Sequence, residues 1–266
     1  MKERNLNGSS LSFPQDELIT FDEGPHIYTV EGVGEMEPVS HVIGRFFKPF
    51  DAEYWSMRKC NGNKAAAAKM REEWDSKGAR ASQAGTFMHK TIEDYINDGH
   101  QTPESLNCQI VYEGQYVKVH EMVNIAREFE YFLHFDRDTQ YTPFRTEWCV
   151  FDPQMRMAGT IDLLCSCPDG TYEIYDWKRS NKIDPAERNR FSHGINGLEH
   201  LSDTSYFHYC LQQNLYRHML ETHYGLSISH MRLVVLHPDK SDYQVVTLPR
   251  MDREVKIIYN YLKVNK

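Results

Sequence analysis

Two aspartates and a lysine flank one turn in the segment MAGTIDLLCSCPDGTYEIYDWKRS, residues 157–180. The tripeptide Pro168-Asp169-Gly170 separates two apolar runs and predicts a tight turn between antiparallel strands. If that turn is centred on Asp169, residues whose numbers sum to 338 face each other, so Asp162 lies opposite Asp176. Lys178 follows two residues later and belongs to the same face of its strand.

These opposed carboxylates predict a cation site. Apolar neighbours on both sides of the two strands indicate a sheet covered on both faces, where paired carboxylates repel each other strongly. A hard divalent ion with oxygen ligands would hold the pair together, with magnesium favoured and manganese a natural substitute. The simpler alternative is a solvated strand edge on which Lys178 forms an ordinary salt bridge.

Further candidates for the site are His89, Glu147, Gln212 and Tyr216. His89 lies in a predicted helix and can turn a ring nitrogen toward a metal. Glu147 precedes the apolar run WCVF on a strand expected beside the hairpin. Gln212 and Tyr216 are one helical turn apart, a spacing that suits hydrogen bonding to a phosphate or stacking on a base. Each also has a purely structural alternative. His89 would be a hydrogen-bonded core histidine and Glu147 an exposed strand carboxylate, and Gln212 and Tyr216 would belong to a helix face that only packs.

Together these residues resemble the PD-(D/E)XK nuclease superfamily, in its RecB-like exonuclease branch. The resemblance rests on an ordered set: His89, Glu147, Gly159-Thr160-Ile161-Asp162, Asp176-Trp177-Lys178 and Gln212-x-x-x-Tyr216. The segments AGTFMH at 84–89 and YCLQQNLYR at 209–217 are similar to viral and phage members. The similarity runs from about residue 28 to the C-terminus.

The resemblance implies an α/β fold: a central mixed β-sheet flanked by α-helices, the restriction-endonuclease-like core, with an N-terminal helical region. It implies catalytic roles for Asp162, Asp176 and Lys178. The implied metal ligands are His89, Asp162, Asp176 and the main-chain carbonyl of Trp177, with Glu147 as a further ligand or a neighbour of the ligands. A metal held there would polarise the scissile phosphate, generate hydroxide from water and stabilise the departing 3′ oxygen.

The charge of Lys178 follows from its predicted neighbours. Lowering a lysine pKa from about 10.4 to roughly 7 or 8 costs on the order of 3 to 5 kcal/mol, and adjacent carboxylates act in the opposite direction. We therefore expect Lys178 to be a charged group that positions water and stabilises the transition state.

Cysteine usage gives no sign of a cluster or structural zinc site. Some RecB-like relatives hold an iron-sulfur cluster with four cysteines, three of them after the core, whereas only Cys210 follows Lys178 here. No iron-sulfur cluster is therefore expected. No CxxC pair occurs, and Cys165 and Cys167 are interpreted as small hydrophobic residues of a strand.

The net charge of −8 and the pI near 5.9 argue against a protein that coats nucleic acid through bulk electrostatics. A local basic strip nevertheless follows Lys178: Arg179, Lys182, Arg188 and Arg190. With Phe191, this strip is predicted to guide a DNA single strand or duplex end toward the metal. The alternative is a solvated charged loop.

We expect residues 1–266 to form a single nuclease domain. Its predicted elements are a helix-rich part at about 40–135, with a loop at 100–115 and a helix at about 116–134, then a sheet core at about 142–266 containing a helix at about 204–222 and an irregular loop at 181–203. No apolar run suits a membrane span or secretory signal, which favours a cytoplasmic protein, in the host cytoplasm if the source is viral or phage.

The leading functional hypothesis is a metal-dependent DNA nuclease, most simply an exonuclease that trims DNA ends in replication, recombination or repair. The alternatives are a structure-specific endonuclease on branched or nicked DNA and a catalytically silent nucleic-acid-binding module. No GxxxxGK[ST] motif is present, so unwinding would require a helicase or replication partner. The sequence makes no prediction of oligomeric state.

Overall fold

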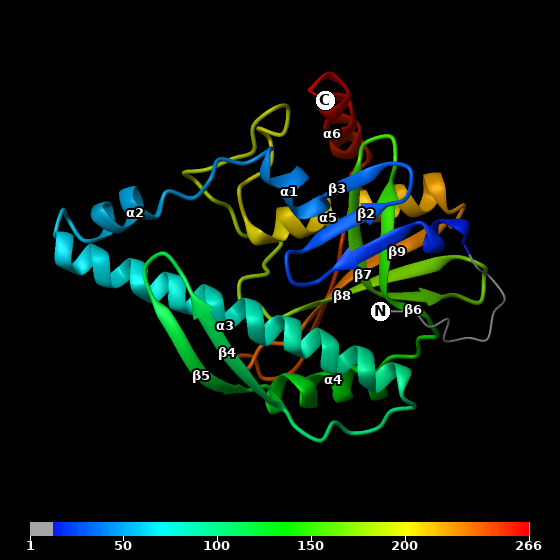
Figure 1. Cartoon of the computed structure of the whole chain (residues 1–266), viewed down its shortest axis with the longest axis horizontal. Coiled ribbons are helices and arrows are strands. Elements are labelled where there is room, and N and C mark those ends of the chain that lie inside the picture. The colour runs from blue at the N-terminus through cyan, green and yellow to red at the C-terminus, as the bar shows by residue number, and fades with distance from the viewer. Residues whose placement is uncertain (1–12, 266) are drawn as a thin grey trace.

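The computed structural model describes residues 13–265 and combines helices and strands throughout (Figure 1). The helices are α1 (Val39–Gly44), α2 (Ala52–Lys59), α3 (Lys64–Asn97), α4 (Ala126–Asp138), α5 (Ser205–His223) and α6 (Asp252–Val264), with a 3-10 turn at Pro14–Glu17. The strands are β1 (Ile19–Asp22), β2 (Ile27–Val30), β3 (Gly34–Pro38), β4 (Asn107–Glu113), β5 (Lys118–Asn124), β6 (Pro143–Asp152), β7 (Met157–Ser166), β8 (Tyr172–Lys178), β9 (Ile228–Val235) and β10 (Gln244–Thr247).

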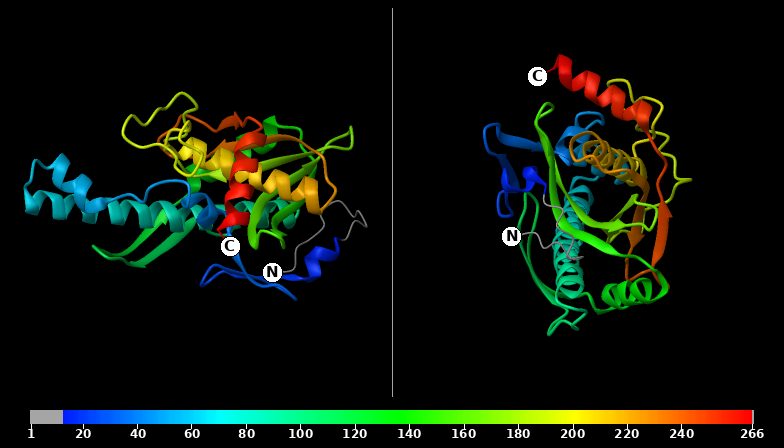
Figure 2. Two further views of the ribbon diagram at one scale, coloured as in Figure 1. Left: turned by 90° about the horizontal axis from the view of Figure 1, so that it is seen from above. Right: turned by 90° about the vertical axis from the view of Figure 1, so that its right-hand side faces the viewer.

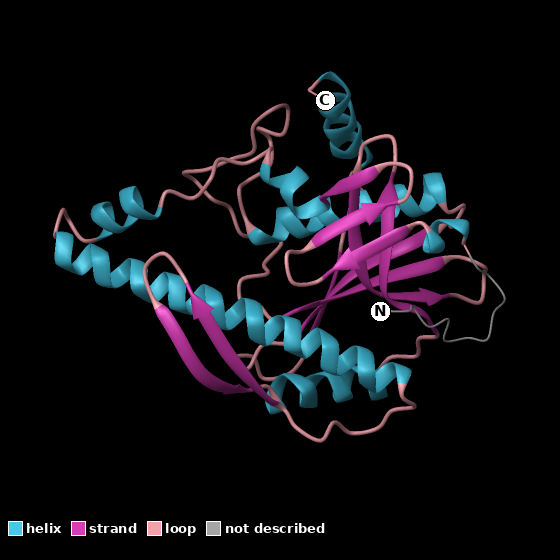
Figure 3. Ribbon diagram, in the orientation of Figure 1, coloured by secondary structure: helices cyan, strands magenta, loops and turns pink. Residues whose placement is uncertain are grey.

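A mixed eight-stranded sheet forms the centre of the fold, in the order β1-β2-β3-β7-β8-β9-β10 with β6 also paired to β7. The pairs β3–β7 and β8–β9 are parallel, whereas the others are antiparallel. Helices cover this sheet (Figure 3). The predicted fold class, a mixed sheet flanked by helices with an N-terminal helical region, is confirmed.

The predicted hairpin forms in the predicted register. Leu163 pairs with Tyr175 and Cys165 with Glu173, so the partners' numbers sum to 338 as expected. The ladder ends at Leu163 and Tyr175, however, so the predicted pairing of Asp162 with Asp176 does not form. Gly170 has a φ of 82°, a conformation that glycine adopts without the steric cost met by other residues. The turn chemistry therefore fixes which residues of β7 and β8 lie at the same level.

One edge of β7 is only partly paired, and this gap positions the candidate site. Strand β6 runs along one edge of β7 from Met157 to Cys165, so β3 and β8 must share the other edge. On that edge, β3 pairs with Met157 and Ala158, and β8 pairs with residues 163–166. Residues 159–162 lie between them and have no strand partner on that side within residues 13–265.

The sheet is buried on both faces, as its apolar strands predict. In β9, Met231, Leu233 and Val235 pack with α5, α1 and α6, whereas Val234 packs with α3 and α4 on the opposite face. Figure 2 shows these two helical layers on either side of the sheet. Alternate residues of one strand thus hold the two layers in fixed positions.

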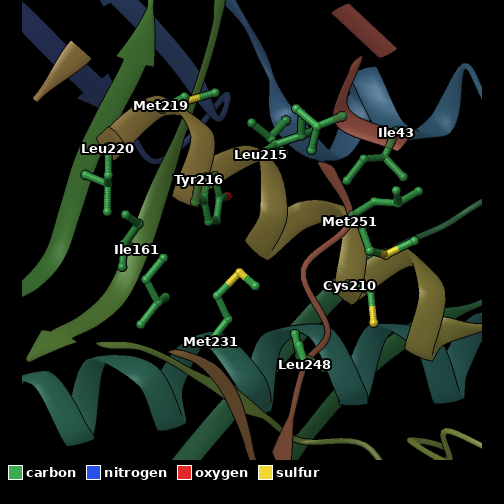
Figure 4. Packing of buried hydrophobic residues seen from close by; sticks show 14 of the residues in the cluster. Ile43, Ile161, Cys210, Leu215, Tyr216, Met219, Leu220, Met231, Leu248 and Met251 are labelled. Atoms are coloured by element: carbon green, nitrogen blue, oxygen red, sulfur yellow. The ribbon is translucent and has the colours of Figure 1, made fainter. Parts of the chain in front are cut away.

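Helix α5 is the centre of one of these layers. Figure 4 shows its residues Leu215 and Tyr216 among Ile161, Met231 and other apolar side chains, and all four are at most 4% exposed. The predicted helix at 204–222 is confirmed, with the Thr204 hydroxyl capping its first turn. Packing along α5 therefore holds its polar residues at a defined height above β7.

The predictions for 100–134 were partly wrong. The predicted loop contains β4, and the first part of the predicted helix is β5, so that α4 begins only at Ala126. Cys108 and Ile110 are buried while their immediate neighbours are exposed, the two-residue alternation of a strand on a helix surface. The Gln83 side chain of α3 also bonds both backbone groups of Val111, which ties this hairpin to α3.

Helix α6 was not among the predicted elements, and its buried face is Val255, Ile258 and Leu262. Residues 181–203 form the predicted irregular loop. Within residues 13–265, none of the helices combines the length and apolar character that a membrane span requires.

Candidate active site

A cavity of about 1210 Å³ opens beside the gap between β7 and β8. Its walls come from parts of the chain that are distant in sequence. They are residues of β1, β2 and their turn, of α3 (Thr86, His89, Lys90, Glu93), of β6 (Thr146, Glu147, Cys149), of β7 (Ala158, Gly159, Thr160, Asp162), of β8 (Asp176, Lys178) and of α5 (Gln212, Tyr216). The predicted carboxylates, lysine, histidine and helix residues therefore border one space.

Asp162 bridges the point at which β7 and β8 separate. It lies directly before Leu163, which with Tyr175 forms the last β7–β8 pair, and its Oδ2 accepts a hydrogen bond of 2.8 Å from the backbone N–H of Trp177. Burial raises the pKa of Asp162 to about 6, against the opposing effects of Lys178 and this hydrogen bond. The Asp162 side chain thus takes the place of the backbone hydrogen bond that Trp177 would otherwise make to β7. The Oδ1 atom of Asp162 is not used in this contact.

His89 has a defined tautomer. Its Nε2 lies 2.8 Å from the carbonyl oxygen of Trp177, and because a carbonyl can only accept, Nε2 carries the proton. Burial, followed by the charge of Lys178, lowers the pKa of His89 to about 4, so the ring is neutral. Its Nδ1 lone pair then faces the Asp162 Oδ2 at 3.4 Å and the Glu147 Oε1 at 3.9 Å.

Glu147 occupies a strained position in β6. Its φ is 44°, in the left-handed region, which costs a non-glycine residue about 1–3 kcal/mol. Its Oε1 is buried and has no hydrogen-bond partner among the described residues. Burial and then the neighbouring Asp162, Glu93 and Asp176 raise the pKa of Glu147 well above its usual value.

These donor atoms fit a divalent cation. One ligand atom each from His89, Glu147 and Asp162 lies within 4.8 Å of the others. A nitrogen lone pair and two carboxylate oxygens that face one another repel unless a cation or proton lies between them. Nitrogen and oxygen donors with an unpartnered buried oxygen are the set that a hard or borderline divalent ion takes.

Asp176 and Lys178 lie beside this group and bond to each other. The Lys178 Nζ is 2.7 Å from the Asp176 Oδ2, and the Asp176 Oδ1 accepts a hydrogen bond of 2.6 Å from Gln213. Burial raises the pKa of Asp176 to about 6, although Lys178 lowers it. Both oxygens of Asp176 are therefore engaged, and Asp176 is not one of the three residues whose ligand atoms lie close together.

Lys178 is held in its charged form. Burial lowers the pKa of Lys178, but Asp176 and Asp162 outweigh that effect and raise it above its ordinary value. The ammonium also lies 4.6 Å from the centre of the Tyr209 ring, a cation–π contact that favours positive charge. The site therefore presents a fixed ammonium group at the edge of the donor cluster.

Gln212 and Tyr216 reach the cavity from α5, and Gln212 donates a hydrogen bond of 3.3 Å to the Tyr216 hydroxyl. A side chain at Gly159 would place its Cβ only 2.5 Å from the Tyr216 hydroxyl oxygen. Glycine at 159 therefore allows the Tyr216 ring to lie directly against β7.

The predicted basic strip has two parts. Arg179 is turned inward, and its Nε donates a hydrogen bond of 2.7 Å to Glu128 at the start of α4, whose side chain is 1% exposed. Lys182, Arg188 and Arg190 lie exposed in the loop after β8, where Arg188 donates to the carbonyl oxygens of Pro185 and Glu187. Arg179 thus braces the strand that carries Lys178, whereas the others face solvent.

Sequence reasoning missed Gln213, which fixes the orientation of Asp176. Gln213 is 1% exposed, next to the recognised Gln212. The sequence did contain a signal for this role: Gln213 and Asn214 are adjacent within an apolar helix, and buried amide side chains require hydrogen-bond partners. The left-handed φ of Glu147 could not be predicted, because glutamate is not a residue type that favours this conformation.

Comparison with known proteins agrees with this geometry. A family model described as the PD-(D/E)XK nuclease superfamily matches residues 63–255. No curated protein matches the chain. The matched range contains His89, Glu147, Asp162, Asp176 and Lys178, and it covers most of the chain. The family implies metal-dependent nuclease activity with DNA as substrate. The chain belongs to the PD-(D/E)XK nuclease superfamily.

Proposed function

We propose that this chain is a magnesium-dependent deoxyribonuclease of the RecB-like exonuclease branch, of viral or phage type, that removes nucleotides from DNA ends. The observation that carries the proposal is the donor group of His89, Glu147 and Asp162 beside the charged Lys178. Two carboxylates and one imidazole suit Mg²⁺ or Mn²⁺, and the adjacent ammonium suits a phosphate oxygen.

The protein's own side chains would divide the work. His89, Glu147 and Asp162 would hold the cation, with Asp176 and the Trp177 carbonyl beside them as the further ligands that the family resemblance implies. A bound cation would supply Lewis acidity toward the phosphate and lower the pKa of a bound water. Lys178, held by Asp176 and indirectly by Gln213, donates hydrogen bonds to the attacking water and to the phosphate as negative charge develops on it.

The α5 residues would orient the scissile phosphate. The Gln212 amide and the Tyr216 hydroxyl border the cavity opposite α3, and Gly159 lets Tyr216 approach β7. Holding the phosphate in line with the attacking water would raise the rate of hydrolysis, because translational and rotational freedom is lost on binding, before the chemical step.

Action at ends is supported by the shape of the cavity. The β1–β2 hairpin forms one wall, through Ile19 to Gly24 and Tyr28, and α3 and α5 form others. A strand terminus can enter such a recess without bending, whereas an internal phosphodiester requires the strand to loop into it. Duplex ends would require opening, for which a separate helicase or replication protein is the proposed partner in repair or recombination.

The test is a time course on labelled DNA with Mg²⁺, with Mn²⁺ and with chelator. We expect linear single-stranded DNA to shorten from an end, and linear duplex DNA to shorten only where its end is opened, while a covalently closed circle of the same sequence persists. Cleavage of the circle at the same rate identifies the endonuclease alternative. Absence of hydrolysis with either metal, together with retained DNA binding, identifies a silent binding module.

A matched pair of variants assigns the activity to the site. Asp162→Asn removes a proposed ligand, whereas Asp169→Asn changes an exposed carboxylate at the turn of the same hairpin. We expect the first to abolish hydrolysis and the second to retain the wild-type rate, because asparagine is also favoured in turns. Equal activity of both variants would contradict the assignment.

A further inference from the structure

Exposed and half-buried aromatic rings gather at one end of the molecule, away from the sheet. They belong to α2, to the segment before it, to α3 and to the loop after β8, and Figure 1 shows α2 and the first turns of α3 extending beyond the sheet. We call them the aromatic patch: Phe50, Tyr54, Trp55, Trp74 and Phe191. Phe191 is 74% exposed, Phe50 67% and Tyr54 53%, so a large share of their apolar surface faces solvent.

Two cations are interleaved with these rings. Arg58 lies 5.4 Å from the Trp55 ring centre and 5.9 Å from that of Phe191, and it donates a hydrogen bond to the Tyr54 hydroxyl. Its neighbour Lys59 lies 5.4 Å from the centre of the Trp74 ring, which also contacts Phe50. Alternating rings and cations are the chemistry with which proteins hold single-stranded nucleic acid.

The patch carries a small excess of positive charge although the chain is acidic. Residues 48–74, which hold four of the five rings, contain six lysines and arginines and four acidic residues, against a net charge of −8 for the whole chain. The loop after β8 adds the exposed Lys182, Arg188 and Arg190, interleaved with the exposed Asp184 and Glu187. A local excess of positive charge on an acidic chain favours a polyanion over an acidic partner.

The loop after β8 connects the patch to the candidate site. It begins directly after Lys178 and carries Phe191, whose ring centre is 6.1 Å from that of Trp55. The loop is braced, because the Asn189 side chain accepts from the backbone N–H of Phe191 and Ser192 and donates to the Asp203 carbonyl. An exposed aromatic ring on a braced loop is presented to solvent at low cost in conformational entropy.

We infer that the aromatic patch binds single-stranded DNA, with bases stacked on Phe191, Trp55 and Tyr54 and phosphates near Arg58 and the loop cations. The inference rests on the proposed function for the identity of the nucleic acid. It adds a second contact, away from the cavity, that holds the strand whose end is being trimmed. Stacking is tolerant of sequence because every base has a π face.

Fluorescence anisotropy with labelled oligothymidylate, in chelator so that no cleavage occurs, tests this inference. We expect Phe191→Ala to weaken binding at least about fivefold, the lower end of the range for loss of one base–aromatic stack. Phe191→Trp should restore it, because a larger ring still stacks. Met122→Ala, which removes a side chain 62% exposed on β5, is the matched control and should bind as wild type does.

The outcomes separate the two proposals. Affinity unchanged in Phe191→Ala, or reduced equally for single-stranded and fully duplex DNA, would overturn the stacking contact. A loss in Met122→Ala as large as that in Phe191→Ala would overturn it as well. Patch-dependent binding of oligothymidylate by a protein that hydrolyses no DNA with Mg²⁺ would support this inference while removing the proposed nuclease function.

Discussion

The charge of Lys178 is set by its carboxylate neighbours, which raise its pKa above the ordinary value. A lysine held in its charged form donates hydrogen bonds, which is the role proposed for it above. The ion pair with Asp176, oriented in turn by Gln213, aims the ammonium at the cavity.

Lys178→Gln should lower the rate of DNA cleavage by about 10² to 10³, the usual effect of losing one donor that acts on transition-state charge. Lys178→Arg should retain a larger part of the rate, because the positive charge remains. Single-turnover cleavage rates of the two variants provide the comparison. An inactive arginine variant beside an active glutamine variant would argue for a different role.

Glu147 combines a cost in stability with a proposed role in metal binding. Its pKa is raised on folding, so its ionisation destabilises the fold as pH rises from the unfolded value of 4.5 toward the folded one. At pH 8, Glu147→Gln should therefore increase the free energy of unfolding by on the order of 1 kcal/mol and weaken Mn²⁺ binding at least about tenfold.

Urea unfolding and calorimetric Mn²⁺ titration give these two readouts. Glu113→Gln, which changes an exposed glutamate of β4, serves as the control and should alter neither quantity. A Glu147→Gln variant that is less stable and binds Mn²⁺ normally would show that the carboxylate has a structural role only.

At the scale of elements, the approach of α5 to β7 depends on one glycine. Gly159→Ala would place a methyl group against the Tyr216 ring, which is itself fixed by the packing of α5, and should destabilise the protein by about 1–3 kcal/mol. Gly78→Ala, in α3 with open space around the new methyl, should instead stabilise by about 0.5–1 kcal/mol. Thermal unfolding measures the stability change of each variant. A stability change of the same sign in Gly159→Ala and Gly78→Ala would contradict the proposed packing.

Asp152 ties the end of β6 to two helices. Burial would raise the pKa of Asp152, but the Met155 N–H, the Tyr259 hydroxyl of α6 and His223 of α5 together lower it. The stability that this provides is present above the unfolded pKa of 3.8 and is lost as pH falls through the folded pKa.

Asp152→Asn should therefore cost about 1–3 kcal/mol at pH 7 and reduce the loss of stability on acidification below about pH 4. Urea unfolding of wild type and variant across this pH range provides the test. Parallel pH profiles for the two proteins would be inconsistent with the pairing.

The elements could be predicted where local chemistry decides them. The Pro168-Asp169-Gly170 turn set the β7–β8 register, and the apolar helix at 204–222 was recognisable as α5. The stretch 107–124 was mistaken because its strands are defined by packing on α3, through Gln83 and the buried Cys108 and Ile110, and no residue of the stretch reveals that partner.

At the scale of the whole molecule, the candidate site exists because β3 and β8 share one edge of β7 and leave residues 159–162 open between them. The sequence indicates which residues gather there but contains no local sign of this gap, which depends on the parallel β3–β7 pairing over a long separation in the chain. The left-handed φ of Glu147 likewise has no local sign in the sequence.

The most direct test of the metal site is anomalous scattering from crystals grown with Mn²⁺. We predict one peak bounded by the His89 Nδ1, the Glu147 carboxylate and the Asp162 carboxylate, at about 2.0–2.4 Å from each bonded atom. The same map from Asp162→Asn crystals should lack the peak. A well-ordered wild-type site with no anomalous peak among these three side chains would contradict the account.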